Sequence, residues 1–141
     1  MLKLDLACGA RCSEGFDGVD ITRVNNRVKY VHNLLSFPWP FEKDSVDEIV
    51  CLHFVEHIPM GFWTPGNSKF DDAEISLLQI NERSVDLFLK FFDEMYRILK
   101  PGGGARVASP QAHNNRAFQD PTHRRFLVPE SYLYLSKTWR T

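Results

Sequence analysis

Short apolar runs alternate with polar turns along most of the chain. Lys3–Leu6, Gly18–Ile21 and Val28–Val31 have the length and composition of strands, and a turn or polar segment follows each of them. The run Val46–His53 is nearly all apolar in its second half, which is typical of a central parallel strand. Ala105–Ser109 is a fifth run of this kind. The pattern therefore predicts an α/β protein built on a five-stranded sheet.

The connection between the first two predicted strands is short. Only about a dozen residues separate Leu6 from Gly18, whereas the crossover helix of a standard parallel unit needs a dozen or more residues for itself. We therefore expect a loop with at most one helical turn.

One amphipathic helix is predicted from about Val85 to Leu99, and Lys100-Pro101-Gly102-Gly103-Gly104 ends it. Its apolar residues recur at helical spacing, and we interpret this stripe as core packing rather than as a binding groove. The stripe comprises Val85, Phe88, Leu89, Phe92, Met95, Tyr96 and Leu99.

Two segments before this helix are predicted to be irregular. Pro38 and Pro40 exclude regular structure around them, and Met60 to about Phe70 is predicted to be a long loop with a lid or binding role.

The length, composition and charge of the chain indicate how many domains it forms and which kinds of partner it can attract. We expect its 141 residues to form one domain, residues 1–141, and the apolar content of 43% is that of a folding sequence. Seventeen basic and eighteen acidic residues give a net charge of -1, so no overall field attracts nucleic acid or acidic lipid. No run approaches the roughly 18 apolar residues of a membrane span. We expect neither a membrane nor a nucleic acid as partner.

The cysteines point to a reducing compartment. Cys8, Cys12 and Cys51 are an odd number without a CxxC pair, and no signal peptide precedes the first strand. Cys8 and Cys12 form too weak a pattern for a zinc site. We expect a cytoplasmic protein in which Cys8 contributes loop backbone and Cys51 is a buried thiol.

Two features near the N-terminus are typical of nucleotide sites. The small-residue turn Ala7–Ala10 follows the first strand, where the backbone of open α/β sheets approaches the ligand. Asp20 ends the second strand, where an acidic residue binds ribose hydroxyls. We predict Asp20 as a ribose ligand. For Asp5, cofactor binding and a structural role capping loop amides are equally good explanations.

Four segments, in this order, resemble the class I S-adenosylmethionine-dependent methyltransferases. They are the first turn, Gly18–Ile21, Val46–Ile49 running into Glu56-His57-Ile58, and Tyr96–Gly103. The resemblance implies a Rossmann-like, open, mostly parallel sheet of order 3-2-1-4-5, flanked by helices and lacking the last two of the family's seven strands. The exposed sheet edge would then be covered by the chain's own tail or by a second copy in a homodimer.

The same resemblance implies S-adenosylmethionine as the cofactor. Asp20 would bind the ribose, Asn33 the adenine edge, and the first turn the methionine part. Ala7 stands where the family usually has glycine, and Asn33 stands where it commonly has aspartate. The cofactor-binding residues that it implies are Asp5, Ala7, Cys8, Gly9, Asp20, Ile21, Asn33, Leu34, Leu52 and His53.

His53 to His57 spells HxxEH, the pattern of inverted zincins. The context opposes a metallopeptidase, because His53 ends a predicted strand and Pro59 cuts the following helix short. A second hypothesis comes from resemblance to metal-dependent O-methyltransferases, which carry a carboxylate-x-x-Glu-His cluster here. It makes Glu56, His57 and the distant His123 candidate ligands beside His53. Because His53 replaces a carboxylate, a softer ion than magnesium, or none, is favoured; we assign no metal and keep a divalent ion as the alternative.

We expect an enzyme that transfers the methyl group of S-adenosylmethionine to a small-molecule or metabolite acceptor, by O- or N-methylation. His57 is the predicted base, with His53 and His123 as alternatives. Two other functions stay open, namely a non-catalytic cofactor-binding subunit and an NAD-dependent oxidoreductase, which would require GxGxxG before a helix. Candidates to line the acceptor site are Phe37, Trp39, Phe62 and Trp63, and candidates to bind an acidic group on the acceptor are His113, Arg116, His123, Arg124 and Arg125.

Overall fold

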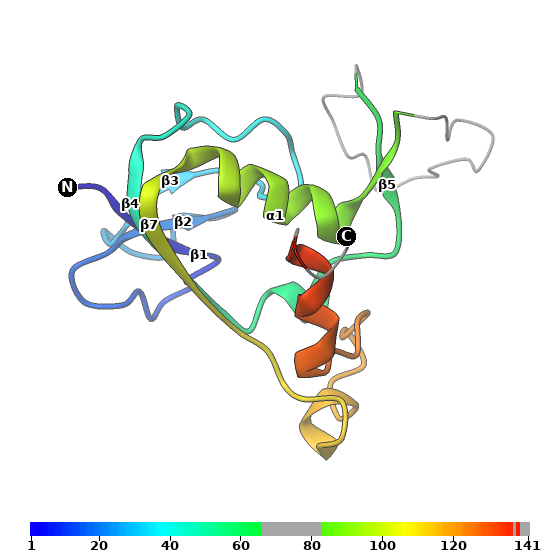
Figure 1. Ribbon diagram of the computed structural model, residues 1–141. Helices are drawn as coiled ribbons and strands as arrows, with labels where there is room; N and C mark the ends of the chain where they lie inside the picture. Colours follow the sequence, from blue (N-terminus) through cyan, green and yellow to red (C-terminus); the bar gives the residue numbers. More distant parts are fainter. Residues whose placement is uncertain (66–82, 137, 139–141) are drawn as a thin grey trace.

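A computed structural model describes residues 1–65, 83–136 and 138 of the chain. Its main sheet has five parallel strands in the order β3-β2-β1-β4-β7 (Figure 1). The predicted parallel sheet and its strand order are confirmed. The strands are β1 (Lys3–Leu6), β2 (Asp17–Asp20), β3 (Val28–Val31), β4 (Val46–Leu52) and β7 (Leu99–Ala108).

The helix α1 (Leu87–Ile98) covers one face of this sheet (Figure 1). Successive side chains of a strand point to opposite faces, and Leu4 and Leu6 of β1 point to the face on which α1 lies. They share a buried cluster with Phe91 and Ile98 of the helix, and all four side chains are fully buried. This layer is the hydrophobic core.

A loop covers part of the opposite face. Residues 7–16, between β1 and β2, contain turns but no helix, as the short spacing predicts. Asp5 accepts a hydrogen bond from the Ser13 backbone N–H at 2.7 Å, and the Lys3 ammonium lies 5.5 Å from the centre of the Phe16 ring. The predicted sheet flanked by helices is therefore confirmed only in part: in the described part of the chain, α1 is the α-helix that packs on the sheet, and a loop lies on the other face.

Cys8 and Cys12 are joined in a disulfide within this loop. The expectation of three unpaired cysteines is wrong for these two, whereas Cys51 is a buried free thiol as predicted. Burial, together with the nearby carboxylates Asp5 and Glu56, raises the pKa of the Cys51 thiol. Cys51 is therefore an unreactive core residue.

The buried face of α1 differs from the predicted stripe. Phe88 and Met95 are buried as expected, but Tyr96 is 84% exposed. The residues that pack inward instead include Glu94, a polar residue that an apolar pattern cannot identify. The other members of the stripe also border an open groove of about 650 Å³, although Leu89, Phe92 and Leu99 pack against the core as expected. This groove is lined by Val85, Leu89, Phe92, Asp93, Met95, Tyr96, Leu99, Tyr134 and Leu135.

β7 begins directly where α1 ends and contains a bulge. Leu99 pairs with Val46, but the next paired residue is Gly104, opposite Glu48. The Pro-Gly-Gly segment that ends the helix is thus accommodated inside the strand. β7 is one of the two edge strands of the sheet among the described residues, at the end opposite β3, and its coverage by a second copy of the chain stays a prediction.

A small antiparallel pair, β5 (Phe62–Trp63) and β6 (Val85–Asp86), projects beside the N-terminal end of α1 (Figure 1). Part of the predicted loop from Met60 to Phe70 lies outside the described residues. Phe37 and Trp39 are buried in the core, and Trp63 contacts Phe37 edge to face with ring centres 6.4 Å apart. These three aromatic residues pack the core rather than wall an acceptor site, whereas Phe62 is 38% exposed.

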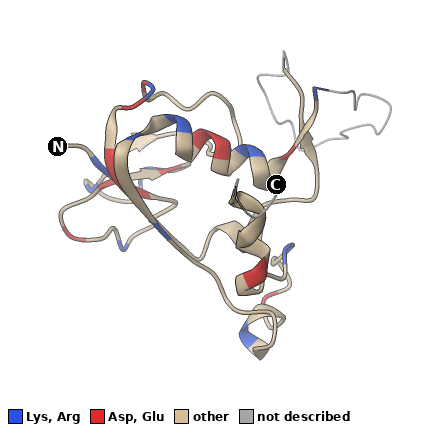
Figure 2. Cartoon of the chain, viewed as in Figure 1, with Lys and Arg blue, Asp and Glu red and all other residues tan. Residues whose placement is uncertain are grey.

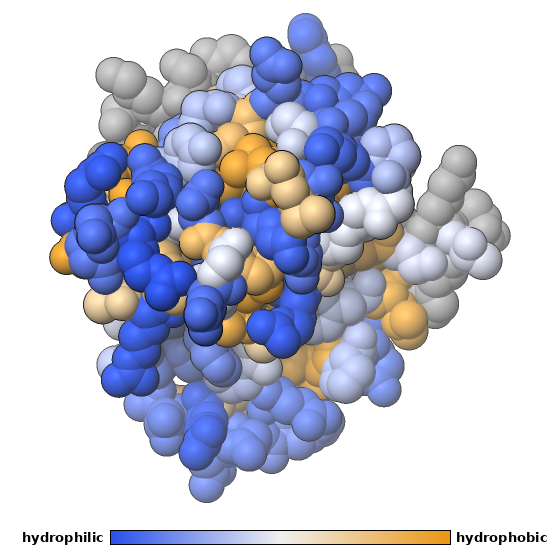
Figure 3. Space-filling model, turned by 90° about the vertical axis from the view of Figure 1, so that its left-hand side faces the viewer, coloured by the Kyte–Doolittle hydropathy of each residue, from blue (hydrophilic) through white to orange (hydrophobic). Residues whose placement is uncertain are grey.

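The surface is mixed in charge. Figure 2 shows acidic and basic residues interspersed along the chain, and Figure 3 shows a largely hydrophilic side with smaller apolar patches between the polar residues. No helix in the described part of the chain is both long and apolar enough to span a membrane.

Candidate functional site

A cavity of about 270 Å³ lies at the carboxyl ends of the strands. Ligands of open parallel sheets bind at this edge, near the point where the strand order reverses, which here is between β1 and β4. Residues that follow β1, β2, β3 and β4 all contribute to its wall. The lining residues are Ala7, Asp20, Ile21, His32, Asn33, Leu34, Leu35, Phe54 and Pro59.

Asp20 organises the first two loops of this cavity. One carboxylate oxygen accepts a hydrogen bond from the Gly9 N–H at 2.8 Å, and the other accepts from the Ile21 N–H at 2.7 Å. Ala7 and Gly9 both have positive φ values, of 54° and 56°, which give the turn its tight shape. Each carboxylate oxygen keeps a free lone pair, so Asp20 can still accept hydrogen bonds from a ligand.

The segment after β3 forms the opposite wall. Asn33 accepts a hydrogen bond from the Leu35 N–H at 2.9 Å through its side-chain oxygen, and its amide NH₂ group is then left to contact a ligand. His32 contacts the Ser36 carbonyl at 2.9 Å through Nε2. Sequence reasoning missed His32 and Leu35, although their position directly after a parallel strand could have identified them.

Five of the ten predicted cofactor residues line this cavity, namely Ala7, Asp20, Ile21, Asn33 and Leu34. Asp5 is buried against the loop amide of Ser13, which corresponds to its structural explanation. Cys8 is held in the disulfide. Gly9, Leu52 and His53 lie outside the lining, and Gly9 contributes through its hydrogen bond to Asp20.

A second group of polar side chains forms around η1 (Val55–His57), the single 3-10 turn that follows β4. One ligand atom each from Glu56, His57 and His123 lies within 4.8 Å of the others. His53 is less closely involved, since its Nδ1 is 3.8 Å from Glu56 and its side chain is 68% exposed. His53 also lies at the end of β4 with a φ of 58°, so the two histidines of HxxEH do not share a helix face.

The chain after β7 brings His123 to this place. The backbone N–H groups of Arg124 and Arg125 both donate to the Glu56 carbonyl, at 2.7 and 3.0 Å. The Arg125 guanidinium donates to the carbonyls of Ile58 at 3.0 Å and Pro59 at 2.9 Å. Arg125 is thus a structural residue rather than a free cation for the acceptor.

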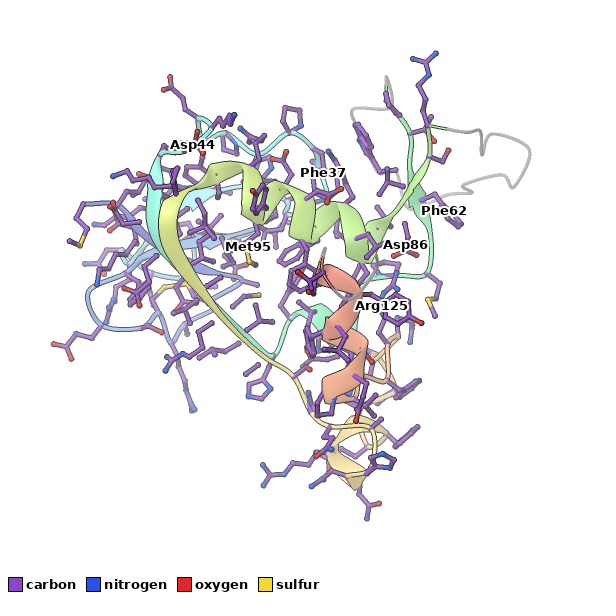
Figure 4. The ribbon with its side chains drawn as sticks, in the orientation of Figure 1. Phe37, Asp44, Phe62, Asp86, Met95 and Arg125 are labelled. Atoms are coloured by element: carbon purple, nitrogen blue, oxygen red, sulfur yellow. A yellow bond between two sulfur atoms is a disulfide. The ribbon has the colours of Figure 1, made fainter. Side chains whose placement is uncertain are left out.

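Asp86 completes this attachment (Figure 4). Its carboxylate lies 3.3 Å from the Arg125 guanidinium and caps α1 by accepting from the Phe88 N–H at 2.9 Å. We expect Asp86→Ala to lower the free energy of unfolding by about 1–2 kcal/mol, because it removes a helix cap and an ion pair together. Urea denaturation measures this change. Asp86→Asn keeps a capping oxygen and should lose less; equal losses would contradict the capping role.

The other residues predicted to bind an acidic acceptor are dispersed. His113 and Arg116 are exposed, and Arg124 donates to the Pro121 carbonyl at 2.8 Å. Asp120 lies among them, and hydrogen bonds from the side chain and backbone of Thr122, with a smaller contribution from nearby His123 and His57, lower the pKa of its carboxyl. This surface is therefore not a single basic site.

The cavity and the polar cluster share one short segment. Phe54 and Pro59 line the cavity, whereas Glu56 and His57 between them join His123. The two features are therefore connected along the chain by the segment from Phe54 to Pro59. Comparison with protein-family models, with curated proteins and with solved structures finds no match to this chain.

Proposed function

We propose that this protein transfers the methyl group of S-adenosylmethionine to a small-molecule acceptor, on a Rossmann-like sheet. The observation that carries the proposal is the cavity at the carboxyl ends of the strands. Asp20, Asn33 and Ala7 of the first turn all line it. A carboxylate at the end of β2 is the usual ribose ligand of such sheets. The four sequence segments shared with class I methyltransferases support the same cofactor.

The first connection supports a mononucleoside cofactor over a dinucleotide. NAD-binding sheets place the pyrophosphate at the N-terminus of a helix that follows β1. Residues 7–16 contain no helix, so the pyrophosphate of a dinucleotide would lack the helix N-terminus that normally binds it. The NAD-dependent oxidoreductase is therefore the weaker alternative.

The segment after β4 supplies the acceptor side in this proposal. Methyl transfer from a sulfonium requires alignment of the acceptor and, for a hydroxyl group, removal of a proton. His57 is the base that we propose, because it is half-buried on η1, between the cavity-lining residues Phe54 and Pro59. His53 and His123 stay alternatives on the same side.

The first test is ligand binding by the whole chain. We expect S-adenosylhomocysteine at millimolar concentration to raise the melting temperature, because a ligand that binds the native state stabilises it. Asp20→Asn should weaken binding at least about tenfold, since it removes charged hydrogen bonds to the ribose. Isothermal titration calorimetry measures the affinity. Asp17→Asn, at the opposite end of the same strand, is the matched control and should bind like the wild type.

The outcomes separate the three functions. No stabilisation by S-adenosylhomocysteine would refute the proposed cofactor, and stabilisation by NAD instead would favour the oxidoreductase. Cofactor binding without methylation of any hydroxyl or amine in a broad acceptor screen would favour the non-catalytic subunit. Circular dichroism of Asp20→Asn shows whether its loop, which Asp20 also holds through Gly9, keeps its structure.

A further inference from the structure

We propose that Glu56, His57 and His123 form a binding site for one divalent transition-metal ion. The three ligand atoms lie within 4.8 Å of one another. A point between three atoms so spaced is about 2.8 Å or less from each of them, and bonds from zinc to nitrogen or oxygen are about 2.0–2.2 Å. Small side-chain rotations therefore bring all three atoms into bonding distance of a single ion.

The buried carboxylate of Glu56 is the independent observation that points to a cation. Glu56 is only 2% exposed, and its Oε2 atom has no hydrogen-bond partner among the described residues. A buried carboxylate oxygen without a partner is costly, and such oxygens in native proteins are normally satisfied. A metal ion at the cluster supplies the missing partner.

The hydrogen bonds of the two imidazoles orient them as ligands. Nδ1 of His123 is 2.8 Å from the Ala117 carbonyl, which can only accept, so Nδ1 carries a proton and, in the neutral ring, Nε2 keeps its lone pair. Nδ1 of His57 is 3.2 Å from the Thr122 hydroxyl, which itself donates to Asp120 at 2.7 Å. His57 must then donate to Thr122, which leaves its Nε2 free as well.

This pattern is the usual outer shell of a metal site. Histidine ligands commonly donate their second nitrogen to a carbonyl or, directly or through another group, to a carboxylate, which fixes the tautomer. Asp120 Oδ2 is 3.6 Å from Nε2 of His123, too far for a hydrogen bond, and adds negative potential near the cluster. The segment that carries His123 is held to the Glu56 carbonyl by two backbone hydrogen bonds, so the three ligands are positioned before the ion binds.

The donor set selects the class of ion. Two imidazoles and one carboxylate suit zinc, iron(II) or another first-row transition ion better than magnesium or calcium, which prefer oxygen ligands. Three protein ligands leave at least one coordination position open, as in catalytic metal sites. Under the proposed function, on which this last step rests, that position would bind an acceptor hydroxyl and lower its pKa. With the ion bound, His57 would act as a ligand, and the more exposed His53 would take its place as base.

The test measures metal binding without methyl transfer, so its failure is distinct from failure of the proposed function. The untagged 141-residue chain, freed of metal by a chelator and kept oxidised so that Cys8 and Cys12 stay paired, is titrated with zinc chloride by calorimetry. We expect one ion per chain with a dissociation constant below about 1 µM, and binding of magnesium chloride at least about 1,000-fold weaker. Glu56→Gln should weaken zinc binding at least about 100-fold.

Two controls keep the result decisive. His113→Ala removes an exposed histidine of the same C-terminal region and should bind zinc like the wild type. X-ray absorption of the zinc-loaded wild type should show only nitrogen and oxygen neighbours, which needs no variant to fold. Absence of stoichiometric binding, sulfur neighbours, or equal affinity in wild type and folded Glu56→Gln would overturn the proposal.

Discussion

Gly18→Ala is expected to lower the free energy of unfolding by about 3 kcal/mol, at the upper end of the usual cost of overpacking. A Cβ at this position would lie 2.6 Å from Sγ of Cys8 and 2.9 Å from the Arg27 carbonyl oxygen, and it would also meet Sγ of Cys12. The sulfur atoms are tied in a disulfide and the carbonyl belongs to the backbone, so neither neighbour can rotate away. Urea denaturation followed by circular dichroism measures the loss.

Gly104→Ala is the matched control for this change. Gly104 also lies in a strand, but a Cβ there meets no atom within 4 Å among the described residues, so its effect should stay within about 0.5 kcal/mol. Replacing Cys8 and Cys12 by alanine in the Gly18→Ala background should recover part of the lost stability relative to the same cysteine variant. Equal stability of Gly18→Ala and wild type would contradict the close packing of this loop on the sheet.

Glu94→Ala should cost about 3 kcal/mol, as expected when one partner of a buried ion pair is removed. Glu94 is 2% exposed, accepts hydrogen bonds from the Arg97 guanidinium at 2.8 Å, and accepts another from the Trp39 N–H at 2.8 Å. The same guanidinium donates to the carbonyls of Phe41 and Trp39. The pair therefore attaches the proline-rich segment before β4 to α1, and thermal or urea unfolding measures its loss.

The contribution of Glu94 to the free energy of unfolding should also depend on pH. Burial raises the pKa of Glu94, but the hydrogen bonds from Arg97 and the Trp39 backbone outweigh it, so the folded pKa of Glu94 lies below its ordinary value. The stabilisation is thus present above the unfolded pKa of about 4.3 and is lost as pH falls through the folded value. Glu94→Gln should flatten the decline below about pH 4.3, whereas exposed Asp93→Ala should leave the stability nearly unchanged.

Much of the sheet could be predicted from local patterns. Strand-length apolar runs locate β1 to β4, and the short β1–β2 spacing excludes a helix there because a crossover helix needs more residues. The buried face of α1 could not be predicted in the same way. Glu94 points inward only because Arg97 and Trp39, brought together by the tertiary fold, satisfy its carboxylate, and no periodicity of apolar residues indicates this.

The candidate site shows the same division. The rule that ligands bind at the carboxyl ends of strands predicts Asp20, and the resemblance to methyltransferases implies Asn33. Both depend on sequence position alone. The place of His123 depends on backbone hydrogen bonds to Glu56 across more than sixty residues of chain, and the sequence offers it only through resemblance. The Cys8–Cys12 pairing was missed because a spacing of four residues is equally compatible with free thiols.

The six residues from Phe54 to Pro59 have one further consequence. Two of them line the cavity and two others belong to the proposed metal cluster, so a shift of this segment on binding one ligand would change the affinity for the other. Thermodynamic linkage requires the two effects to be equal: the factor by which the ion changes nucleoside affinity is the factor by which the nucleoside changes ion affinity. Through this short segment, the protein would respond to the presence of both ligands together rather than to either one alone.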